Sequence, residues 1–246
     1  MEQNDTKIFG LRAILEAIDA GQEMEKVYLQ KEIQGPLAKV LQNKIRENNI
    51  SFSYVPAEKL NKLSKYQNHQ GAIAKTSSII FQDLEKLLES FEESNTTPLF
   101  LLLDQISDVR NLGAILRTAE CTGVDAVIVP THGSAPINAD AIKTSAGAAF
   151  KINICKVNHV LDAVYQLQAL GIQIVSITEK CSKTVYEVDF KNPTALVMGS
   201  EHMGISNSVL KISDQKAKLP LKGSIDSLNV SVACGAVLYE VIRQRS

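Results

Sequence analysis

The stretch PLFLLLDQISDVRNLGAILRTAE, residues 98–120, joins an apolar run to a polar loop and then to an amphipathic segment. The run PLFLLLD has the length and composition of a strand that is buried on both faces. An apolar stripe with the i, i+3, i+4, i+7 spacing of one helix face follows, formed by Leu112, Ile115, Leu116 and Ala119. Asn111, directly before this stripe, is a good N-cap residue. The stretch therefore predicts a buried strand followed by a helix over residues 112–122.

Three further apolar runs of strand length follow, namely DAVIVP (125–130), IQIVSIT (172–178) and TALVMGS (194–200). Helical patterns lie between them over residues 139–150 and 160–170, and a short one follows Gly204. Apolar strands that alternate with helices are typical of a parallel sheet covered on both faces. The tripeptide LPL (219–221) also has the composition of a short buried strand. We therefore predict a parallel-sheet α/β domain over residues 98–246.

The front of the chain has a different pattern of shorter elements. Residues 10–20, 36–48 and 57–63 have helical patterns, whereas residues 26–29, 50–55 and 69–75 have those of strands. This pattern predicts a small α/β domain over residues 1–75. Residues 76–97 are polar and acidic, contain one helical patch and end before Pro98, which is typical of an exposed linker.

The charge balance permits an RNA partner without indicating one. The 246-residue chain is 45% hydrophobic and has a formal net charge of −1. Lysines and arginines number 11 in residues 1–75 against 9 carboxylates, which gives +2, and the acidic middle segment carries −4. The two flanking parts are thus mildly basic.

Composition also bears on location, metals and thiols. The polar N-terminus is not a secretory signal, and no apolar run has the roughly 18 residues of a membrane span. The four cysteines have neither CxxC nor Cys/His metal spacing. We therefore expect a cytoplasmic protein with reduced core thiols and no metal site.

In an open parallel sheet, ligands bind beyond the carboxyl ends of the strands. The segments that follow the predicted strands are rich in Gly, Ser, Asn and carboxylates, which predicts a site there. No GxGxxG follows the first strand, so a dinucleotide site is disfavoured. GSEHMGIS (199–206) has the glycine spacing of a phosphate-binding loop, but Ile205 stands where that loop requires lysine. A nucleotide-binding protein is therefore disfavoured too.

Arg117 is a candidate functional cation with two interpretations. Helical side chains lean toward the N-terminus, so Arg117 is expected to lie back over Gly113, where no side chain blocks it. It would then point toward the start of the helix and the carboxyl edge of the sheet. Alternatively, Arg117 forms an ordinary surface pair with Glu120. Spacing alone leaves both open.

Three segments carry a family resemblance: DVRNLGAILRTAE (108–120), LVMGSEHMGIS (196–206) and LPLKGSIDSLNVSVACGAVLYEVIRQRS (219–246). In order and spacing they resemble the three motifs of the SpoU/TrmH family of RNA 2′-O-ribose methyltransferases. IFGLRAILEAI (8–18) and NHQGAIAK (68–75) resemble the substrate-binding domain of the same family. Within it, the chain is most similar to the bacterial enzymes that methylate a guanosine ribose in 23S ribosomal RNA.

This resemblance implies a SPOUT-like fold whose C-terminal segment forms a trefoil knot, S-adenosylmethionine as methyl donor, and a homodimer whose active site draws on both subunits. It implies ribosomal RNA as the substrate. The family's catalytic positions fall on Asn111, Arg117, Glu201 and Asn229. Its cofactor positions fall on Thr178, Gly199, Leu219, Ser227 and Leu228. The first motif departs from the family pattern, because it reads Asp108-Val109-Arg110-Asn111 without the common proline, which puts a direct role of Asp108 in doubt.

The roles of these residues can be weighed chemically. A guanidinium is effectively never deprotonated in a protein. Arg117 is therefore expected to grip an RNA phosphate and steady the developing alkoxide rather than to act as the base. Glu201 either orients the loop or the nucleoside, or caps the helix after Gly204. The small residues 230–236 are expected to let the last helix pack closely against the knot and a second subunit.

The N-terminal domain is expected to bind RNA, with Arg12, Lys65, Asn68 and His69 as the candidate residues. Two rival functions stay open. One is a methyltransferase of the same family that acts on tRNA, which the extra N-terminal domain disfavours. The other is an inactive RNA-binding or ribosome-assembly protein on the same fold, which the presence of Asn111, Arg117 and Glu201 disfavours.

Overall fold

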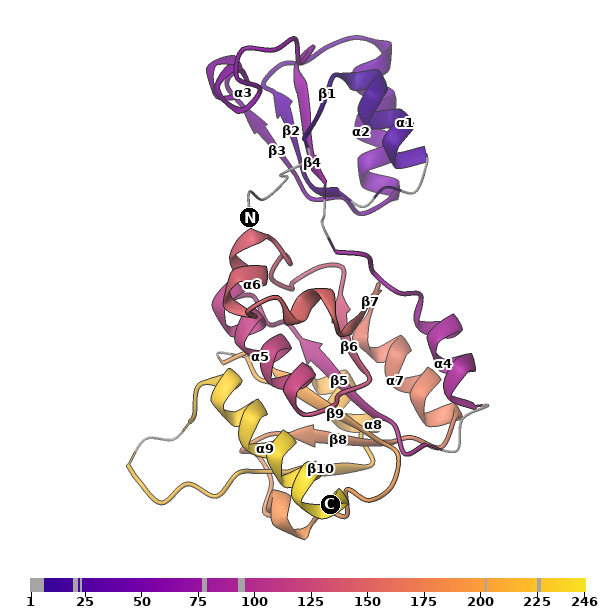
Figure 1. The fold of residues 1–246 in the computed structure, drawn as a ribbon, viewed down its shortest axis with the longest axis vertical. Helices are drawn as coiled ribbons and strands as arrows, with labels where there is room; N and C mark the ends of the chain where they lie inside the picture. The colour runs from indigo at the N-terminus through magenta and orange to yellow at the C-terminus, as the bar shows by residue number, and fades with distance from the viewer. Residues whose placement is uncertain are drawn as a thin grey trace. The chain divides into compact units, whose positions relative to one another are not determined.

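The computed structural model describes residues 7–19, 22, 24–76, 79–92, 96–201, 203–224 and 227–246, without the side chains of Glu92 and Ala139. The chain divides into two compact units, Met1–Ile80 and Phe81–Ser246. Figure 1 shows the elements of each unit. Each unit is an α/β structure built around its own sheet.

The first unit has a four-stranded sheet in the order β1-β4-β2-β3. Its strands are β1 (Lys7–Phe9), β2 (Met24–Gln30), β3 (Phe52–Val55) and β4 (Ala72–Thr76). Strands β2 and β3 are parallel, and the other pairs are antiparallel. Its helices are α1 (Leu11–Asp19), α2 (Pro36–Glu47) and α3 (Ala57–Leu63). Only β1 was absent from the sequence prediction, since three residues are too few for a periodic pattern.

Each face of this sheet is covered differently. Apolar side chains of α1 and α2, such as Ile14 and Leu41, pack with Val27, Leu29 and Ala74 on one face. The short helix α3 covers part of the other face, where its buried Leu60 packs with Val55 and Ile73. Successive strand residues point to opposite faces, so the two clusters together fix which side of the sheet each strand residue occupies.

The second unit has a six-stranded sheet in the order β10-β8-β9-β5-β6-β7, and every pairing in it is parallel. The strands are β5 (Leu99–Asp104), β6 (Ala126–Pro130), β7 (Asn153–Val157), β8 (Gln173–Ile177), β9 (Thr194–Gly199) and β10 (Gln215–Ala217). All six residues of β5 are buried, as expected for a strand covered on both faces. The predicted parallel sheet is therefore confirmed.

Helices cover both faces of this sheet (Figure 1). They are α4 (Leu84–Glu92), α5 (Val109–Cys121), α6 (Ala139–Thr144), α7 (Val160–Ala169), α8 (Asn207–Ile212) and α9 (Val230–Arg245), with single 3₁₀ turns at Ala148–Phe150 and Val185–Glu187. Side chains of α4, α7 and α8 pack with Phe100 and Leu102 of β5. The alternating residues of β5 face the other side, where α5 and α9 pack against each other.

Helix α4 corrects the prediction that residues 76–97 form an exposed linker. Its Leu84 and Leu88 are buried in the core of the second unit, and Phe91 packs edge-on against Phe100. The helix has acidic residues on its exposed face, and these gave the segment its linker-like composition. An apolar stripe on the other face, at helical spacing, joins it to the domain core.

Three other boundaries differ from the sequence prediction. The strand predicted at LPL lies earlier, as β10, and Leu221 is 41% exposed. Strand β7 was missed, because Lys156 and its neighbours break the apolar run at an edge of the sheet. The helix predicted over 139–150 is interrupted after Thr144, where Ala146 and Gly147 adopt positive φ angles.

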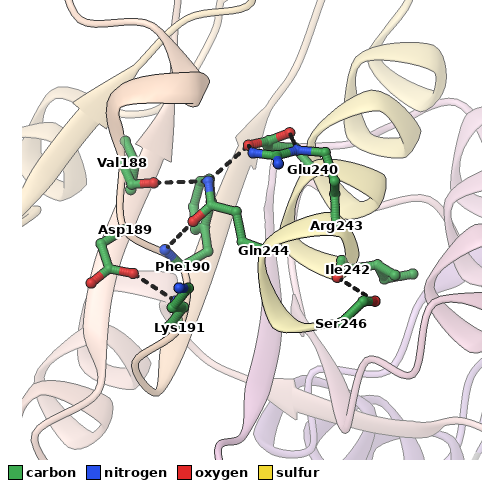
Figure 2. A network of polar contacts seen from close by, with 9 residues as sticks. All are labelled: Val188, Asp189, Phe190, Lys191, Glu240, Ile242, Arg243, Gln244 and Ser246. Carbon is green, nitrogen blue, oxygen red and sulfur yellow. Dashed lines mark hydrogen bonds and ion pairs between the residues drawn. The ribbon is translucent and has the colours of Figure 1, made fainter.

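The segment after the last strand connects β10 to α9, whose C-terminal end is held by a polar network (Figure 2). The Gln244 amide accepts a 2.9 Å hydrogen bond from Phe190 N and donates to Val188 O at 3.0 Å. Arg245 donates to the carbonyl oxygens of Phe190, Thr97 and Asn192 at 2.7–2.9 Å. The last helix is thereby tied to two strand-flanking segments that are distant in sequence.

Candidate functional site

A pocket lies beside the carboxyl ends of β8, β9 and β10, at the edge where ligands of parallel sheets bind. It is lined by Ile177, Thr178, Glu179, Met198, Gly199, Ser200, Glu201, Gly204, Lys218, Leu219, Leu221, Ser227, Leu228, Val230 and Ala233. Apolar side chains form much of its wall, and the lining also includes two carboxylates, those of Glu179 and Glu201. The backbone of residues 219–222 and 227–229 is irregular, so part of the wall is peptide groups outside helices and strands.

Side chains from the three motif segments of the sequence, residues 108–120, 196–206 and 219–246, meet at one side of this pocket. Asn111 Nδ2 donates to Glu201 Oε1 at 3.0 Å. Asn229 Nδ2 donates to the same Glu201 oxygen at 2.6 Å and to Asn111 Oδ1 at 3.0 Å. Residues 90 and 28 positions apart in sequence are thus joined in one hydrogen-bonded cluster, which we call the Asn-Glu-Asn cluster (Asn111, Glu201, Asn229).

The start of α5 explains how Asn111 reaches this cluster. Asp108 is the N-cap residue, and its Oδ1 accepts a 2.8 Å hydrogen bond from Asn111 N. The prediction that Asn111 caps the helix was therefore wrong, because the helix begins at Val109. Because Asp108 binds a free N–H group of the first turn, the Asn111 side chain is available to Glu201. This gives Asp108 a structural role.

The start of α9 is built around the other two members. Asn229 is its N-cap, and its Oδ1 accepts from Ser231 N at 3.0 Å. Glu201 Oε1 also accepts from Val230 N at 3.3 Å, so a carboxylate stands at the positive end of a 16-residue helix. Glu201 therefore contacts the start of α9. The prediction that it caps the helix after Gly204 was wrong. The Ser206 N–H at the start of α8 is bound by Asp104 Oδ2 at 2.7 Å.

Gly199 closes the turn that presents Glu201. Ser200 and Gly204 exchange two backbone hydrogen bonds of 3.2 and 2.9 Å, and Gly204 has a φ angle of +69°. A Cβ atom at position 199 would overlap the backbone of Gly204 and Ile205. The glycines of GSEHMGIS therefore serve a tight turn and close backbone contact, and Ile205 is a buried residue of the core.

The five residues assigned to the cofactor by resemblance, Thr178, Gly199, Leu219, Ser227 and Leu228, all line the pocket. Thr178 is buried, and its N–H is bound to Ala217 O. Leu228 is 42% exposed at the opening. The sequence reasoning missed Ile177, Met198 and Lys218 as wall residues. Their signal was positional, because each stands at or beside the last residue of a strand.

Arg117 lies apart from the pocket and is not among the residues that line it. Its side chain is exposed on α5. The space over Gly113 is not open, because a Cβ there would lie 2.6 Å from Thr144 Cβ of α6, so that prediction was wrong. Glu120, the alternative partner, lies 3.8 Å from Lys151 Nζ instead. Within a single chain, the Arg117 side chain is therefore exposed to solvent on α5.

The four N-terminal candidates divide into exposed and internally bonded side chains. Arg12 is exposed on α1, and Lys65 is exposed in the turn after α3. His69 Nδ1 accepts from Gly71 N at 3.0 Å, so its Nε2 carries the proton and donates to Asn61 Oδ1 at 3.0 Å. Asn68 Oδ1 accepts from Gln70 N. His69 and Asn68 thus shape the turn that leads into β4.

The cysteines differ in exposure and in reactivity. All four cysteines are free thiols. Burial raises the pKa of the Cys234 thiol to about 12, and burial also raises the pKa of Cys155 to about 11, so both are poor nucleophiles. Cys121 is exposed, contrary to the expected core position. Among the described residues, no group of three His, Cys, Asp or Glu side chains could hold a metal ion.

The fold and site define an α/β protein with a parallel sheet and an apolar pocket at the carboxyl edge of that sheet. A small separate α/β unit precedes this sheet in the sequence. Sequence profiles identify both units: that of the SpoU rRNA Methylase family matches residues 98–239, and that of RNA 2′-O ribose methyltransferase substrate binding matches residues 7–81. The chain therefore belongs to the SpoU rRNA methylase family. In the described residues, no helix is long and apolar enough to cross a membrane.

Individual relatives agree with this assignment. The chain is 33% identical to the 23S rRNA (guanosine-2′-O-)-methyltransferase RlmB of Vibrio parahaemolyticus, over 97% of this chain and 96% of that protein. It is 30% identical to the putative TrmH family tRNA/rRNA methyltransferase YacO of Bacillus subtilis, over 100% and 98% of the two chains. The crystal structure of the SpoU methyltransferase AviRb from Streptomyces viridochromogenes with the cofactor AdoMet superposes with a TM-score of 0.61 at 26% identity, over 97% and 90% of the chains.

Proposed function

We propose that this protein transfers a methyl group from S-adenosylmethionine to a ribose 2′-OH of RNA, with a guanosine of 23S ribosomal RNA as the target. The Asn-Glu-Asn cluster supports this most directly, because it joins one residue from each of the three family motifs at the rim of the pocket. The names of the full-length relatives support the ribosomal substrate. Ribosomal RNA as the partner also leads us to place the protein in the cytoplasm.

The pocket is chemically suited to S-adenosylmethionine. Ile177, Leu219 and Leu228 offer apolar surface to a planar base. The irregular backbone from 219 to 222 offers N–H and C=O groups to polar edges, and the carboxylates of Glu179 and Glu201 can accept from hydroxyl or ammonium groups. When bound, the cofactor supplies an electrophilic methyl group on its sulfonium. Thr178, Gly199 and Ser227 complete the proposed cofactor site.

The Asn-Glu-Asn cluster would position the nucleoside and the loops around it. Glu201 is held by two amide donors and one backbone N–H, so its carboxylate is fixed in orientation. Holding two reacting groups in line can supply roughly 7–11 kcal/mol of the barrier reduction in favourable cases. Positioning is therefore the main contribution that we assign to this cluster.

Arg117 would act on the RNA in a homodimer. It lies outside the residues that line the pocket of its own chain, so we propose that it serves the pocket of a second copy. There its guanidinium would bind an RNA phosphate in bidentate fashion and stabilise the developing alkoxide. Since a guanidinium keeps its proton, the 2′-OH proton leaves by another acceptor.

The exposed face of α9 is the proposed dimer surface. Val232 and Tyr239 are 57% and 59% exposed on this face, with Ala236 between them. Helix α9 packs against α5, and a Cβ at Gly235 would make an ordinary van der Waals contact with Thr118 of α5. The exposed apolar face thus lies beside the helix that carries Arg117, and apolar surface of this kind favours association.

The decisive experiment supplies purified protein with methyl-labelled S-adenosylmethionine and either unmodified 23S rRNA or unmodified tRNA. We expect label in the 23S rRNA at a guanosine whose 3′ linkage becomes resistant to alkali. Label in tRNA instead would favour the tRNA methyltransferase. Absence of transfer together with no cofactor binding in calorimetry would favour an inactive RNA-binding protein.

The role of Arg117 is tested by R117K with R110K as the matched control on the same helix. Lysine keeps the charge but not the bidentate geometry, so we expect single-turnover methylation to fall about 100-fold in R117K. R110K should stay within about twofold of the wild type, since that effect lies within 0.5 kcal/mol. Near-normal methylation by R117K would refute the bidentate grip.

A further inference from the structure

The two faces of the first unit's sheet differ in charge. Val27, Leu29 and Ala74 pack under α1 and α2, so their strand neighbours Lys26, Tyr28, Ile73 and Lys75 point to the opposite face, where α3 lies. Lys7 is on that side too, because its Nζ donates to Leu63 O at 3.5 Å. We call this side the α3 face: it comprises Lys7, Glu25, Lys26, Tyr28, Lys75 and the residues of α3 with the turn through Tyr66.

Among the described residues, the α3 face carries six lysines and two carboxylates, a net charge of +4. The lysines are Lys7, Lys26, Lys59, Lys62, Lys65 and Lys75, and the carboxylates are Glu25 and Glu58. The side with α1 and α2 carries four cations against three carboxylates, a net charge of +1, namely Arg12, Lys39, Lys44 and Arg46 with Glu16, Asp19 and Glu47. Lys31 and Glu32 lie in a turn and cancel. The unit's positive charge is therefore concentrated on one face.

Two of these lysines converge on one aromatic ring. Lys26 Nζ of β2 lies 5.6 Å from the centroid of the Tyr28 ring, and Lys59 Nζ of α3 lies 5.7 Å from the same centroid. Both ammonium groups lie within the range of cation–π attraction to this ring. The ring is thus flanked by positive charge from a strand and from a helix, and a phosphate group beside Tyr28 would interact favourably with both.

The internal pairing of the face leaves a defined set of cations for a ligand. Lys75 pairs with Glu25 at 3.1 Å, and Lys7 is bound to the end of α3. Lys59, Lys62 and Lys65 are exposed along one side of α3 and its turn. Directly after them, Tyr66 has 78% of its surface exposed, so a large aromatic ring stands beside a row of ammonium groups.

We propose that the α3 face binds single-stranded RNA, with the lysines on successive phosphates and the Tyr66 ring stacked on a base. Aromatic rings interleaved with cations are what unpaired RNA requires, because its bases are free to stack and its backbone is charged. The proposal rests on the proposed function, for it names the surface of this chain that holds the RNA substrate.

The test compares two double variants that each remove two exposed positive charges. K59Q/K62Q acts on the α3 face, and K39Q/R46Q acts on α2; in each, one residue lies in the last turn of its helix. The probe is fluorescein-labelled oligouridylate of about 12 nucleotides, within the site sizes of single-strand binders. Fluorescence anisotropy over a range of salt concentrations gives the affinity and its salt dependence.

We expect K59Q/K62Q to weaken binding roughly 10- to 30-fold at about 0.1 M salt and to lower the salt slope by about 1.4, as two lost phosphate contacts on a single strand require. K39Q/R46Q should change the affinity less than about threefold. Y66L should weaken binding about tenfold, whereas Y66F, which keeps the ring, should bind as the wild type does. All five altered positions are exposed, and thermal melts verify that the variants are folded.

Equal losses in both double variants would overturn the proposal, since only long-range charge would then matter, and so would unchanged binding by K59Q/K62Q. Methyl transfer to 23S rRNA is measured separately. If the wild type methylates no RNA while K59Q/K62Q still loses oligouridylate binding, the proposed function fails and the α3 face stands. If the wild type methylates rRNA and K59Q/K62Q binds oligouridylate normally, the proposed function stands and the α3 face is not the RNA-binding surface.

Discussion

The two ends of helix α9 are both held by polar networks, but the networks differ in surroundings. At the N-terminal end, the Asn-Glu-Asn cluster is largely exposed beside the pocket. At the C-terminal end, Glu240 is 6% exposed and is bound by Arg243 and Gln244 (Figure 2). Arg245 donates to backbone carbonyl groups of two segments, at Thr97 and at Phe190 and Asn192. An exposed network gains little folding energy from its charges, so its geometry points to a ligand, whereas the buried one points to stability.

This comparison predicts that changing the exposed end affects activity far more than stability. E201Q removes the negative charge of this side chain. It also replaces one carboxylate oxygen by an NH2 group, which cannot accept the hydrogen bonds that are donated to Glu201. A hydrogen bond to a charged group is worth about 1.5–3 kcal/mol, so we expect methylation of rRNA to fall roughly 10- to 100-fold. The melting temperature should move by less than about 3 °C, equivalent to less than 1 kcal/mol.

The measurements are single-turnover methylation and a thermal melt on the same preparation. E89Q is a suitable control, because it makes the same change at a glutamate that is exposed on α4 and is not among the residues that line the pocket. A large fall in melting temperature with normal turnover would show that the exposed cluster is structural and would end the contrast between the two ends.

At the opposite end, we predict that R245A lowers stability and leaves turnover per folded molecule unchanged. Its guanidinium donates to Phe190 O, Thr97 O and Asn192 O, and part of this surface is buried. Removal should cost about 2 kcal/mol, which corresponds to a melting temperature lower by about 4–8 °C. A urea titration followed by circular dichroism measures the loss.

R243A is the neighbouring control. The Arg243 side chain is 69% exposed, although its partner Glu240, at 2.8 Å, is only 6% exposed. Because water can reach most of Arg243, R243A should destabilise the protein less than R245A does. If R245A instead abolished methylation at a temperature where the protein is fully folded, the buried end would have a direct influence on the pocket.

The same contrast separates what the sequence could predict from what it could not. The apolar runs predicted four of the six strands, β5, β6, β8 and β9, because burial on both faces requires continuous apolar residues. The strand expected at residues 219–221 was wrong, since β10 ends at Ala217. β7 was missed, since its edge position admits Lys156. Helix α4 looked like a linker because its composition averages an acidic face with the buried Leu84 and Leu88.

At the site, local patterns could place residues on strand ends but not pair them. The hydrogen bonds of Asn229 to Glu201 and Asn111 span 28 and 118 positions, and no spacing rule links such residues. Nor could spacing show that α6 fills the space over Gly113. Family resemblance supplied the grouping of the motifs, and the trefoil knot that it implies stays a prediction.

The smallest expected effect is the pH dependence of stability that Glu240 causes at the buried C-terminal end of α9. Hydrogen bonds from Arg243, followed by those from Gln244 and the charge of Arg243, lower the pKa of Glu240 to about 2 against an ordinary value of 4.5. A folded-state pKa below the unfolded one means that the carboxylate stabilises the fold above pH 4.5 and that this contribution is lost as the pH falls toward 2. We therefore expect urea midpoints of the wild type to fall between pH 5 and pH 3, and those of E240Q to fall less over the same range. Parallel curves for the two proteins would show that Glu240 is not a stabilising carboxylate, and the distinction between the two ends of α9 would then rest on Gln244 and Arg245.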